Sequence, residues 1–320
     1  MERREVLSLP KDIIIDCDVG IDDALAIMFA LGSKELRIRA ITTVCGNAEV
    51  EKTSKNALKV LEAFDVGDIP VARGHSRPLK RELYTAGYVH GSDGLGDSKL
   101  QEPRLKLDAR HAVDVIIDEA EQGGLHLVCL GPLTNLASAL GKAPSLAKEL
   151  EDVTIMAGAF GLTPYGFGNV TPVSEFNAYV DPEAAKIVFN SGLRLTIVGL
   201  DVTTDPTATL TRHNYEKIVA FPKRGARFLK RISENILESW GSFSLHDPMT
   251  VAYVVDPSLL GVREYPVDVE TEGTIARGQT VADRRPWPEV VKFKGKAKVA
   301  TSVDGRRFLD TFEERAIRNL

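Results

Sequence analysis

The sequence predicts an α/β fold: a mainly parallel, mixed central sheet with helices on both faces. Short apolar runs with the composition of buried strands recur along the chain, at residues 12–19, 38–44, 69–74, 125–131, 153–159 and 193–202. Helical patterns separate most of them, for example at residues 50–64 and 112–122. This alternation is typical of βαβ units. No repeat or low-complexity linker interrupts it, so we expect one large domain over residues 1–320.

The first predicted strand ends in a cluster of aspartates, in the segment IIIDCDVGIDDALAI at residues 13–27. Side chains alternate along a strand, so Asp16 and Asp18 point to the same side. Asp22 and Asp23 fall where a helix begins, and a carboxylate there can cap free N–H groups. Capping explains one aspartate but not four, because crowded carboxylates raise one another's pKa unless a cation, a shared proton or hydrogen-bond donors compensate. The segment therefore predicts a functional carboxylate site.

Composition and charge exclude several classes of protein. The chain has 40 Lys and Arg against 45 Asp and Glu, without a dense basic block, so we expect no nucleic-acid partner. Cys17, Cys45 and Cys129 lack paired spacing and lie in apolar runs, which predicts reduced, buried thiols and a cytoplasmic location. No apolar run approaches the roughly 18 residues of a membrane helix, and no signal peptide is evident. We therefore expect neither export nor membrane insertion.

Polar residues also follow the other predicted strands. In a parallel sheet, ligands bind beyond the carboxyl ends of the strands, where loops converge. The residues in these positions are Asn47, Thr134, Asn169, Glu175 and Asn177. Taken singly, Asn47 and Thr134 are typical cap or turn residues. Their joint placement is what indicates a binding site.

Two histidines lie near predicted element boundaries. His246 and Asp247 precede a proline and a new apolar helical pattern, although Asp-Pro alone is a common helix start. The segment HGSDGLGD, residues 90–97, lacks the Lys-Ser/Thr pair of a phosphate-binding loop. We interpret it as a tight loop that presents His90 or Asp93. For His90, a solvated position and a catalytic role are both open at this point.

This set of residue types favours a hard cation. Oxygen ligands without histidine or paired thiols suit Ca²⁺ or Mg²⁺ better than zinc, and carboxylates with backbone carbonyls suit calcium best. Such an ion can hold a water beside an aspartate and can bind paired sugar hydroxyls. With a proton donor such as His246, the arrangement fits cleavage of a glycosidic bond.

Six motifs occur in a fixed order: DCDVGIDDA, TTVCGN, HGSDGLG, LGPLTNLA, GNVTPVSEFNAYVDPEAA and HDPMTVA. Together they resemble the calcium-dependent nucleoside hydrolases, the inosine-uridine-preferring family, over roughly residues 12–260. The resemblance implies a single Rossmann-like domain, a bound Ca²⁺ ion and hydrolysis of the N-glycosidic bond of ribonucleosides to free base and ribose. It also implies a homodimer or homotetramer.

The resemblance implies a role for each matching residue around the ion. Asp18 would be the general base that acts on a calcium-bound water. The ion would be held by Asp18, Asp23, the backbone carbonyl of Thr134, and Asp247. Asp16 would lie close by in support.

The resemblance also implies how the substrate is held. The ribose hydroxyls would bind Asp22, Asn47, Glu175 and Asn177. The 5′ end would lie near Asn169 and Met156. His246 would lie beside the base and assist its departure, and His90 would be a second histidine near the base.

Two segments depart from the family pattern. The connection at residues 157–169 is longer than usual, which affects the implied contacts to the 5′ end. The segment at residues 227–243, expected to cover the base, lacks tyrosine, so the sequence does not indicate a purine or pyrimidine preference.

Two alternative functions remain open at this point. The strand-end DxD also opens the phosphotransferases of the haloacid dehalogenase type, in which Asp16 would be the nucleophile and Asp18 the acid/base. Asp201 and Asp205 could then be metal ligands, but the aspartates of the helix start would have no role. A non-catalytic sugar- or calcium-binding protein would keep the pocket without needing Asp18 as a base.

Overall fold

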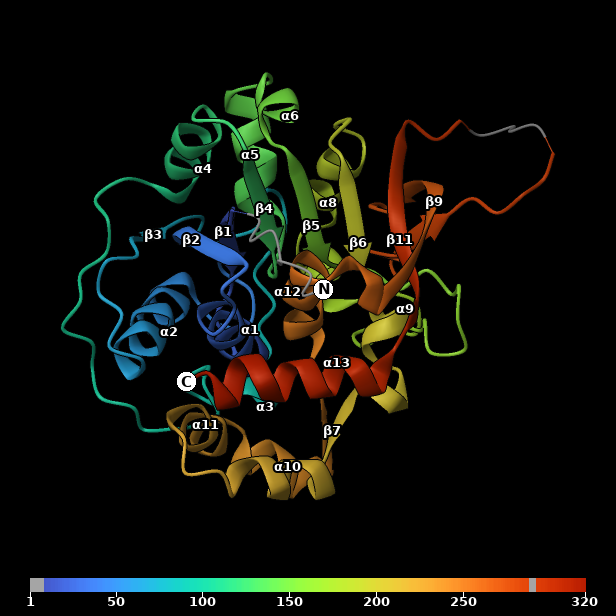
Figure 1. The fold of residues 1–320 in the computed structure, drawn as a ribbon. Coiled ribbons are helices and arrows are strands. Elements are labelled where there is room, and N and C mark those ends of the chain that lie inside the picture. The colour runs from blue at the N-terminus through green and yellow to red at the C-terminus, as the bar shows by residue number, and fades with distance from the viewer. Residues whose placement is uncertain (1–8, 288–291) are drawn as a thin grey trace, which may run out of the picture.

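The computed structural model describes residues 9–287 and 292–320. In this part of the chain a nine-stranded sheet has the order β10-β9-β11-β6-β5-β4-β1-β2-β3 (Figure 1). Its strands are β1 (Lys11–Cys17), β2 (Leu36–Thr43), β3 (Val71–Arg73), β4 (Leu125–Cys129), β5 (Asp152–Met156), β6 (Leu195–Val198), β9 (Leu260–Val269), β10 (Thr280–Ala282) and β11 (Gly295–Val303). Neighbours from β11 to β3 run parallel, whereas β9 is antiparallel to both β11 and β10. The predicted mixed, mainly parallel sheet is confirmed.

Both faces of the sheet are buried, which explains the continuous apolar runs of its strands. In β1, Ile13 and Ile15 join one hydrophobic core, and Ile14 joins the other. Helices α1 (Ile21–Leu31), α2 (Val50–Ala63), α12 (His246–Val255) and α13 (Gly305–Phe312) pack in the first core. Helices α4 (Ala112–Ala120), α5 (Thr134–Lys142) and α8 (Pro182–Phe189) pack in the second. The expected helices on both faces are therefore present.

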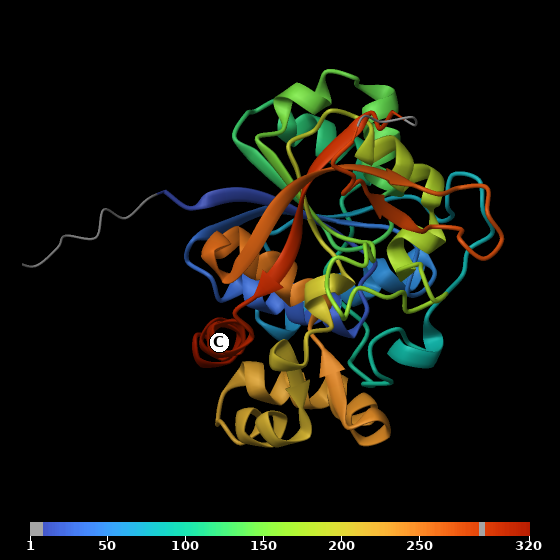
Figure 2. The same cartoon turned by 90° about the vertical axis from the view of Figure 1, so that its right-hand side faces the viewer.

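Shorter elements connect the main strands and helices. They are α3 (Gly87–His90), α6 (Leu146–Glu149), α7 (Phe176–Val180), α9 (Leu200–Thr203), two 3₁₀ turns (Pro206–Ala208 and Pro257–Leu259) and a π-helical turn (Glu313–Arg318). A separate two-stranded sheet of β7 (Thr209–Thr211) and β8 (Ser242–Ser244) lies with α10 (Arg212–Val219) and α11 (Arg224–Trp240), at the bottom of Figures 1 and 2.

The structure refines several sequence-based expectations. All six predicted strands form, but the C-terminal strands β9, β10 and β11 were not predicted. β9 alternates between partly buried and exposed positions and includes charged residues, so its apolar signal is weak. Cys17, Cys45 and Cys129 are free and buried, as expected. Within the described ranges, no helix combines the length and the apolar character needed to cross a membrane.

Candidate active site

A cavity of about 330 Å³ lies at the carboxyl ends of the central strands. Nine residues singled out from the sequence for catalysis or substrate binding line it: Asp18, Asp22, Asn47, His90, Met156, Asn169, Glu175, Asn177 and His246. Asp247 also reaches its wall, whereas Asp23 and Thr134 are fully buried and do not line it. Segments far apart in the sequence thus meet at one edge of the sheet.

Asp18 is held by the turn between β1 and α1. Its backbone N–H donates to Oδ1 of Asp23 (3.1 Å), and the N–H of Gly20 donates to Oδ2 of the same carboxylate (2.8 Å). Asp23 therefore does the capping that the sequence suggested for one aspartate. The Asp18 carboxylate accepts the N–H of Asn47 at 2.7 Å. It fits only because its neighbour Gly46 has no side chain, since a Cβ there would lie 2.0 Å from Oδ2 of Asp18.

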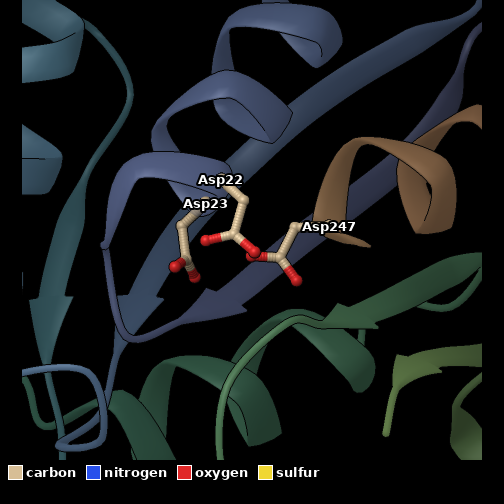
Figure 3. A group of neighbouring side chains, drawn as sticks. All are labelled: Asp22, Asp23 and Asp247. Atoms are coloured by element: carbon tan, nitrogen blue, oxygen red, sulfur yellow. The ribbon is translucent and has the colours of Figure 1, made fainter. Parts of the chain in front are cut away.

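Three carboxylates converge beside this turn (Figure 3). Asp22 and Asp23 come from the first turn of α1 and Asp247 from the first turn of α12, and one oxygen of each lies within 4.8 Å of the others. Oδ1 of Asp22 is buried without a hydrogen-bond partner. Burial, with the charge of Asp23, raises the pKa of Asp22 to about 8. Burial followed by neighbouring aspartates also raises the pKa of Asp18 and of Asp247.

The cavity has no cationic side chain to offset these acids. Among the described residues, neither Lys nor Arg lines it, although Asp18, Asp22, Glu175 and Asp247 all do. Hard divalent cations prefer oxygen ligands, and a cluster of buried carboxylates with one unpartnered oxygen supplies such ligands. The residues present therefore fit a metal ion.

Glu175 and Asn177 are fixed by backbone groups. Glu175 caps α7 by accepting the N–H groups of Asn177 (2.7 Å) and Ala178 (3.1 Å). The side-chain amide of Asn177 donates to the carbonyls of Leu130 (2.7 Å) and Met156 (3.1 Å). These bonds leave the amide oxygen of Asn177, and further lone pairs of Glu175, for a polar ligand.

Two imidazoles, of His90 and His246, line the same cavity. Nδ1 of His90 accepts the N–H of Ile21 at 3.1 Å, which leaves the ring proton on Nε2. Burial, with the nearby His246, lowers the pKa of His90 to about 3, and burial lowers the pKa of His246 to about 4. Of the two interpretations left open for His90, the solvated one is wrong, because His90 ends α3 and is buried. Asp93 instead accepts N–H groups within its own loop and lies outside the cavity.

The phosphotransferase alternative finds no support in the geometry. Asp16 is fully buried and does not reach the cavity. One of its oxygens accepts from Thr42 (2.7 Å) and Asn135 (2.8 Å). Asp201 accepts backbone N–H groups of the 157–169 connection, so its carboxylate organises that loop and does not face the aspartate cluster.

Sequence reasoning missed the aromatic wall of the cavity. Tyr88, Phe176, Trp240 and Phe243 line it, and two of these come from the segment that lacks tyrosine. Trp240 ends α11 and is 58% exposed, which is unusual for a large aromatic side chain. Its position just before Gly241, at the end of an amphipathic helix, was the available signal.

Comparisons with known proteins assign the family. Residues 13–310 match the model of a family described as inosine-uridine preferring nucleoside hydrolase. The chain belongs to this family. An inosine-uridine preferring nucleoside hydrolase of Leishmania major is 39% identical over 310 residues, which cover 94% of this chain and 95% of the relative. A pyrimidine-specific ribonucleoside hydrolase of Shewanella sp. strain MR-7 is 38% identical over 314 residues, with the same coverage.

Solved structures of nucleoside hydrolases have the same fold. A plant nucleoside hydrolase superposes with a TM-score of 0.90 and 36% identity, covering 96% of this chain and 99% of the other. A purine-preferring ribonucleoside hydrolase from Gardnerella vaginalis gives a TM-score of 0.87 and 33% identity, covering 97% and 99%. The protein is thus a nucleoside hydrolase, an enzyme that cleaves ribonucleosides, and the non-catalytic alternative is wrong. Its relatives include purine-preferring and pyrimidine-specific enzymes, so their names do not indicate its base preference.

We predict that the chelator-treated enzyme loses stability as the pH rises toward 8. The carboxyl of Asp22 has an ordinary pKa of 3.8 when unfolded and about 8 when folded, so the folded state binds more protons between these values. The resulting stabilisation is complete below 3.8 and is lost as the pH rises through about 8. Unfolded histidines titrate at about pH 6.5 in the wild type and in Asp22→Asn alike, so the difference between the two proteins isolates the effect of the carboxylate.

The measurement is the melting temperature in EDTA between about pH 6.5 and pH 8.5, for the wild type and for Asp22→Asn. The wild-type value should fall with pH, and the variant should fall less. Equal slopes for the two proteins would contradict the assignment to Asp22.

Proposed function

We propose that the enzyme hydrolyses the N-glycosidic bond of ribonucleosides with Asp18 as the general base and His246 at the leaving base. The observation that carries this proposal is that buried carboxylates and two imidazoles share one cavity. Buried carboxylates gather at the β1–α1 turn and the start of α12, and two imidazoles lie at the same cavity. A sugar can thus be held by the carboxylates while its base lies against the histidines.

We infer that the metal ion is calcium, bound by Asp18, Asp23, Asp247 and the backbone carbonyl of Thr134. The support is the cluster around Asp247, the unpartnered oxygen of Asp22 and the all-oxygen donor set. When bound, calcium supplies positive charge that offsets the carboxylates, orders neighbouring hydroxyls and lowers the pKa of a nearby water.

Asp18 takes the proton of the attacking water. The oxygen of this water bonds to C1′ of the ribose as the bond from C1′ to the base nitrogen breaks, through an oxocarbenium-like state. Burial and the charge of Asp23 raise the pKa of Asp18, which strengthens it as a proton acceptor. The bond from the Asn47 N–H fixes its orientation.

Ribose would be bound by polar groups that the backbone already holds in place. Asp22, Asn47, Glu175 and Asn177 are the acceptors and donors for its hydroxyls. Their preorganisation reduces the entropy lost when the sugar binds. Asn169 and Met156 line the same cavity and would contact the 5′ end.

His246 would assist departure of the base. A base that leaves as an anion is costly, and a proton given from Nε2 to its nitrogen removes that cost. The ring returns to the neutral state as it gives up a proton previously taken from solvent. Burial lowers the pKa of His246 to about 4, so the ring is mostly neutral near pH 7 and its small protonated fraction is a strong acid. His90 would be a second hydrogen-bond donor near the base.

Three further proposals concern the domain, the compartment and the assembly of the protein. We propose that residues 1–320 form one functional domain, because one sheet runs from β1 to β11 and separates both cores. A reducing, cytoplasmic compartment suits the three free cysteines. A homodimer or homotetramer stays a prediction, for which sedimentation is the test.

We predict that Asp18→Asn lowers kcat by roughly 10²–10⁴ on every substrate in a panel of purine and pyrimidine ribonucleosides, because the proton acceptor is lost. Released ribose is the readout, and the wild type should release it from the panel. The matched control is Asp118→Asn, a half-exposed residue of α4 far from the cavity, which should leave kcat unchanged. If the wild type consumes a nucleoside without releasing ribose, or if Asp18→Asn keeps its activity, the proposal is refuted.

We predict that Asp23→Ala and Asp247→Ala each lose bound calcium together with activity, because each removes a carboxylate from the proposed donor set. Calcium per chain is measured by elemental analysis after dialysis. Full calcium content in either folded variant would remove that residue from the ligand set. Asp118→Asn again is the control and should keep its calcium.

We predict that His246→Ala lowers kcat strongly for natural nucleosides, by roughly 10²-fold or more, but much less for p-nitrophenyl riboside. The nitrophenolate leaves without protonation, so it does not need an acid. Parallel losses on the two substrates, with metal occupancy confirmed, would mean that His246 only orients Asp247 or caps α12.

A further inference from the structure

A buried hydroxyl lies behind His246. Thr203 ends α9, its side chain is fully buried, and its Oγ1 lies 2.8 Å from Nδ1 of His246. Thr203 does not line the cavity, so it touches the imidazole from the side away from the substrate. Over the described ranges, this is the one side-chain hydrogen bond made by either residue.

The contact determines which ring nitrogen is available. Nδ1 is occupied by Thr203, whereas Nε2 has no hydrogen-bond partner in the part of the chain that the structure describes. Nε2 is not among the buried side-chain atoms without a partner, and His246 itself lines the cavity. The ring is therefore held by Nδ1 with Nε2 open to the cavity.

We propose that Thr203 is a positioning residue that holds the His246 ring with Nε2 directed at the leaving base. The inference rests on the proposed role of His246. A threonine hydroxyl can both donate and accept, so it can donate to a bare Nδ1 and accept from a protonated one. The same contact thus holds the ring in either tautomer with Nε2 open to the cavity, which a methyl group in place of the hydroxyl cannot do.

Thr203 is itself fixed in place. Its N–H donates to the carbonyl of Gly199 (3.2 Å), and the N–H of Leu200 donates to Gly158 (2.8 Å). Asp201, in the same short helix, accepts the N–H groups of Phe160 (2.7 Å) and Leu162 (2.6 Å). α9 is thus tied to the end of β5 and to the 157–169 connection, so the hydroxyl is a rigid support for the ring.

The test uses Thr203→Val, which keeps the shape and removes the hydroxyl, and Thr203→Ser, which keeps the hydroxyl. For inosine and uridine, Thr203→Val should lower kcat roughly tenfold or more and leave KM little changed. The loss is smaller than the full contribution of a general acid, because the imidazole is still present. For p-nitrophenyl riboside, kcat should change by less than about threefold, because no proton is needed. Thr203→Ser should restore kcat on the nucleosides.

Thr204→Val is the matched control. Its hydroxyl follows directly after α9 but bonds the carbonyls of Leu200 (2.7 Å) and Tyr165 (3.1 Å), not His246. It should change the rates on both substrate types by the same factor. A purely structural role of Thr203 would give this pattern as well, so equal losses in Thr203→Val would overturn the inference.

A double-variant cycle separates the inference from the function on which it rests. If Thr203 acts through His246, Thr203→Val should cause no further loss in a His246→Ala background. An additive loss there would refute the inference while leaving the acid role of His246 intact. If His246→Ala alone keeps full kcat on nucleosides, the proposed acid role itself fails. Because the double variant is compared with His246→Ala, the cycle remains decisive even if Thr203→Val loses some stability.

Discussion

The site depends on one electrostatic constraint: buried carboxylates crowd at the β1–α1 turn, and no described Lys or Arg reaches them. Like charges this close are unstable in a buried site unless protons or a cation compensate. Backbone N–H groups stabilise part of the charge, since Asp23 accepts from Asp18 and Gly20. The remaining charge, with the unpartnered oxygen of Asp22, fits a bound cation.

The fold meets this constraint by bringing strand ends together. β1, β2, β4 and β5 end at the same edge, and small residues there allow close approach, as at Gly46 beside Asp18. From adjacent positions, α12 then adds Asp247 to the acidic cluster and His246 to the lining of the same cavity. In the proposed mechanism, metal binding by Asp247 and base departure at His246 are thus coupled through one helix start. Trp240 and Phe243 of the aromatic wall belong to a separate segment, residues 227–243, which contributes none of the carboxylates that line the cavity.

The sequence was informative where the signal is local. A strand that is buried on both faces has a continuous apolar sequence, so β1 could be predicted. Its carboxylates could be predicted as a site because the aspartates lie within a few residues of one another. β9 could not, because its exposed positions dilute the apolar pattern. Thr203 and His246 are 43 residues apart, and only the packing of α9 against α12 brings them into contact. Burial of His90 likewise depends on α1, whose Ile21 N–H it accepts.

The central claim is that a divalent ion replaces protons on these carboxylates. Titration calorimetry of the chelator-treated enzyme with CaCl₂ near pH 7, in two buffers of different ionisation heat, tests it most directly, because carboxyls with raised pKa values must release protons when the ion binds. The account predicts one saturable site per chain and a binding heat that depends on the buffer through proton release. Absence of saturable binding, or binding without proton release, would contradict it.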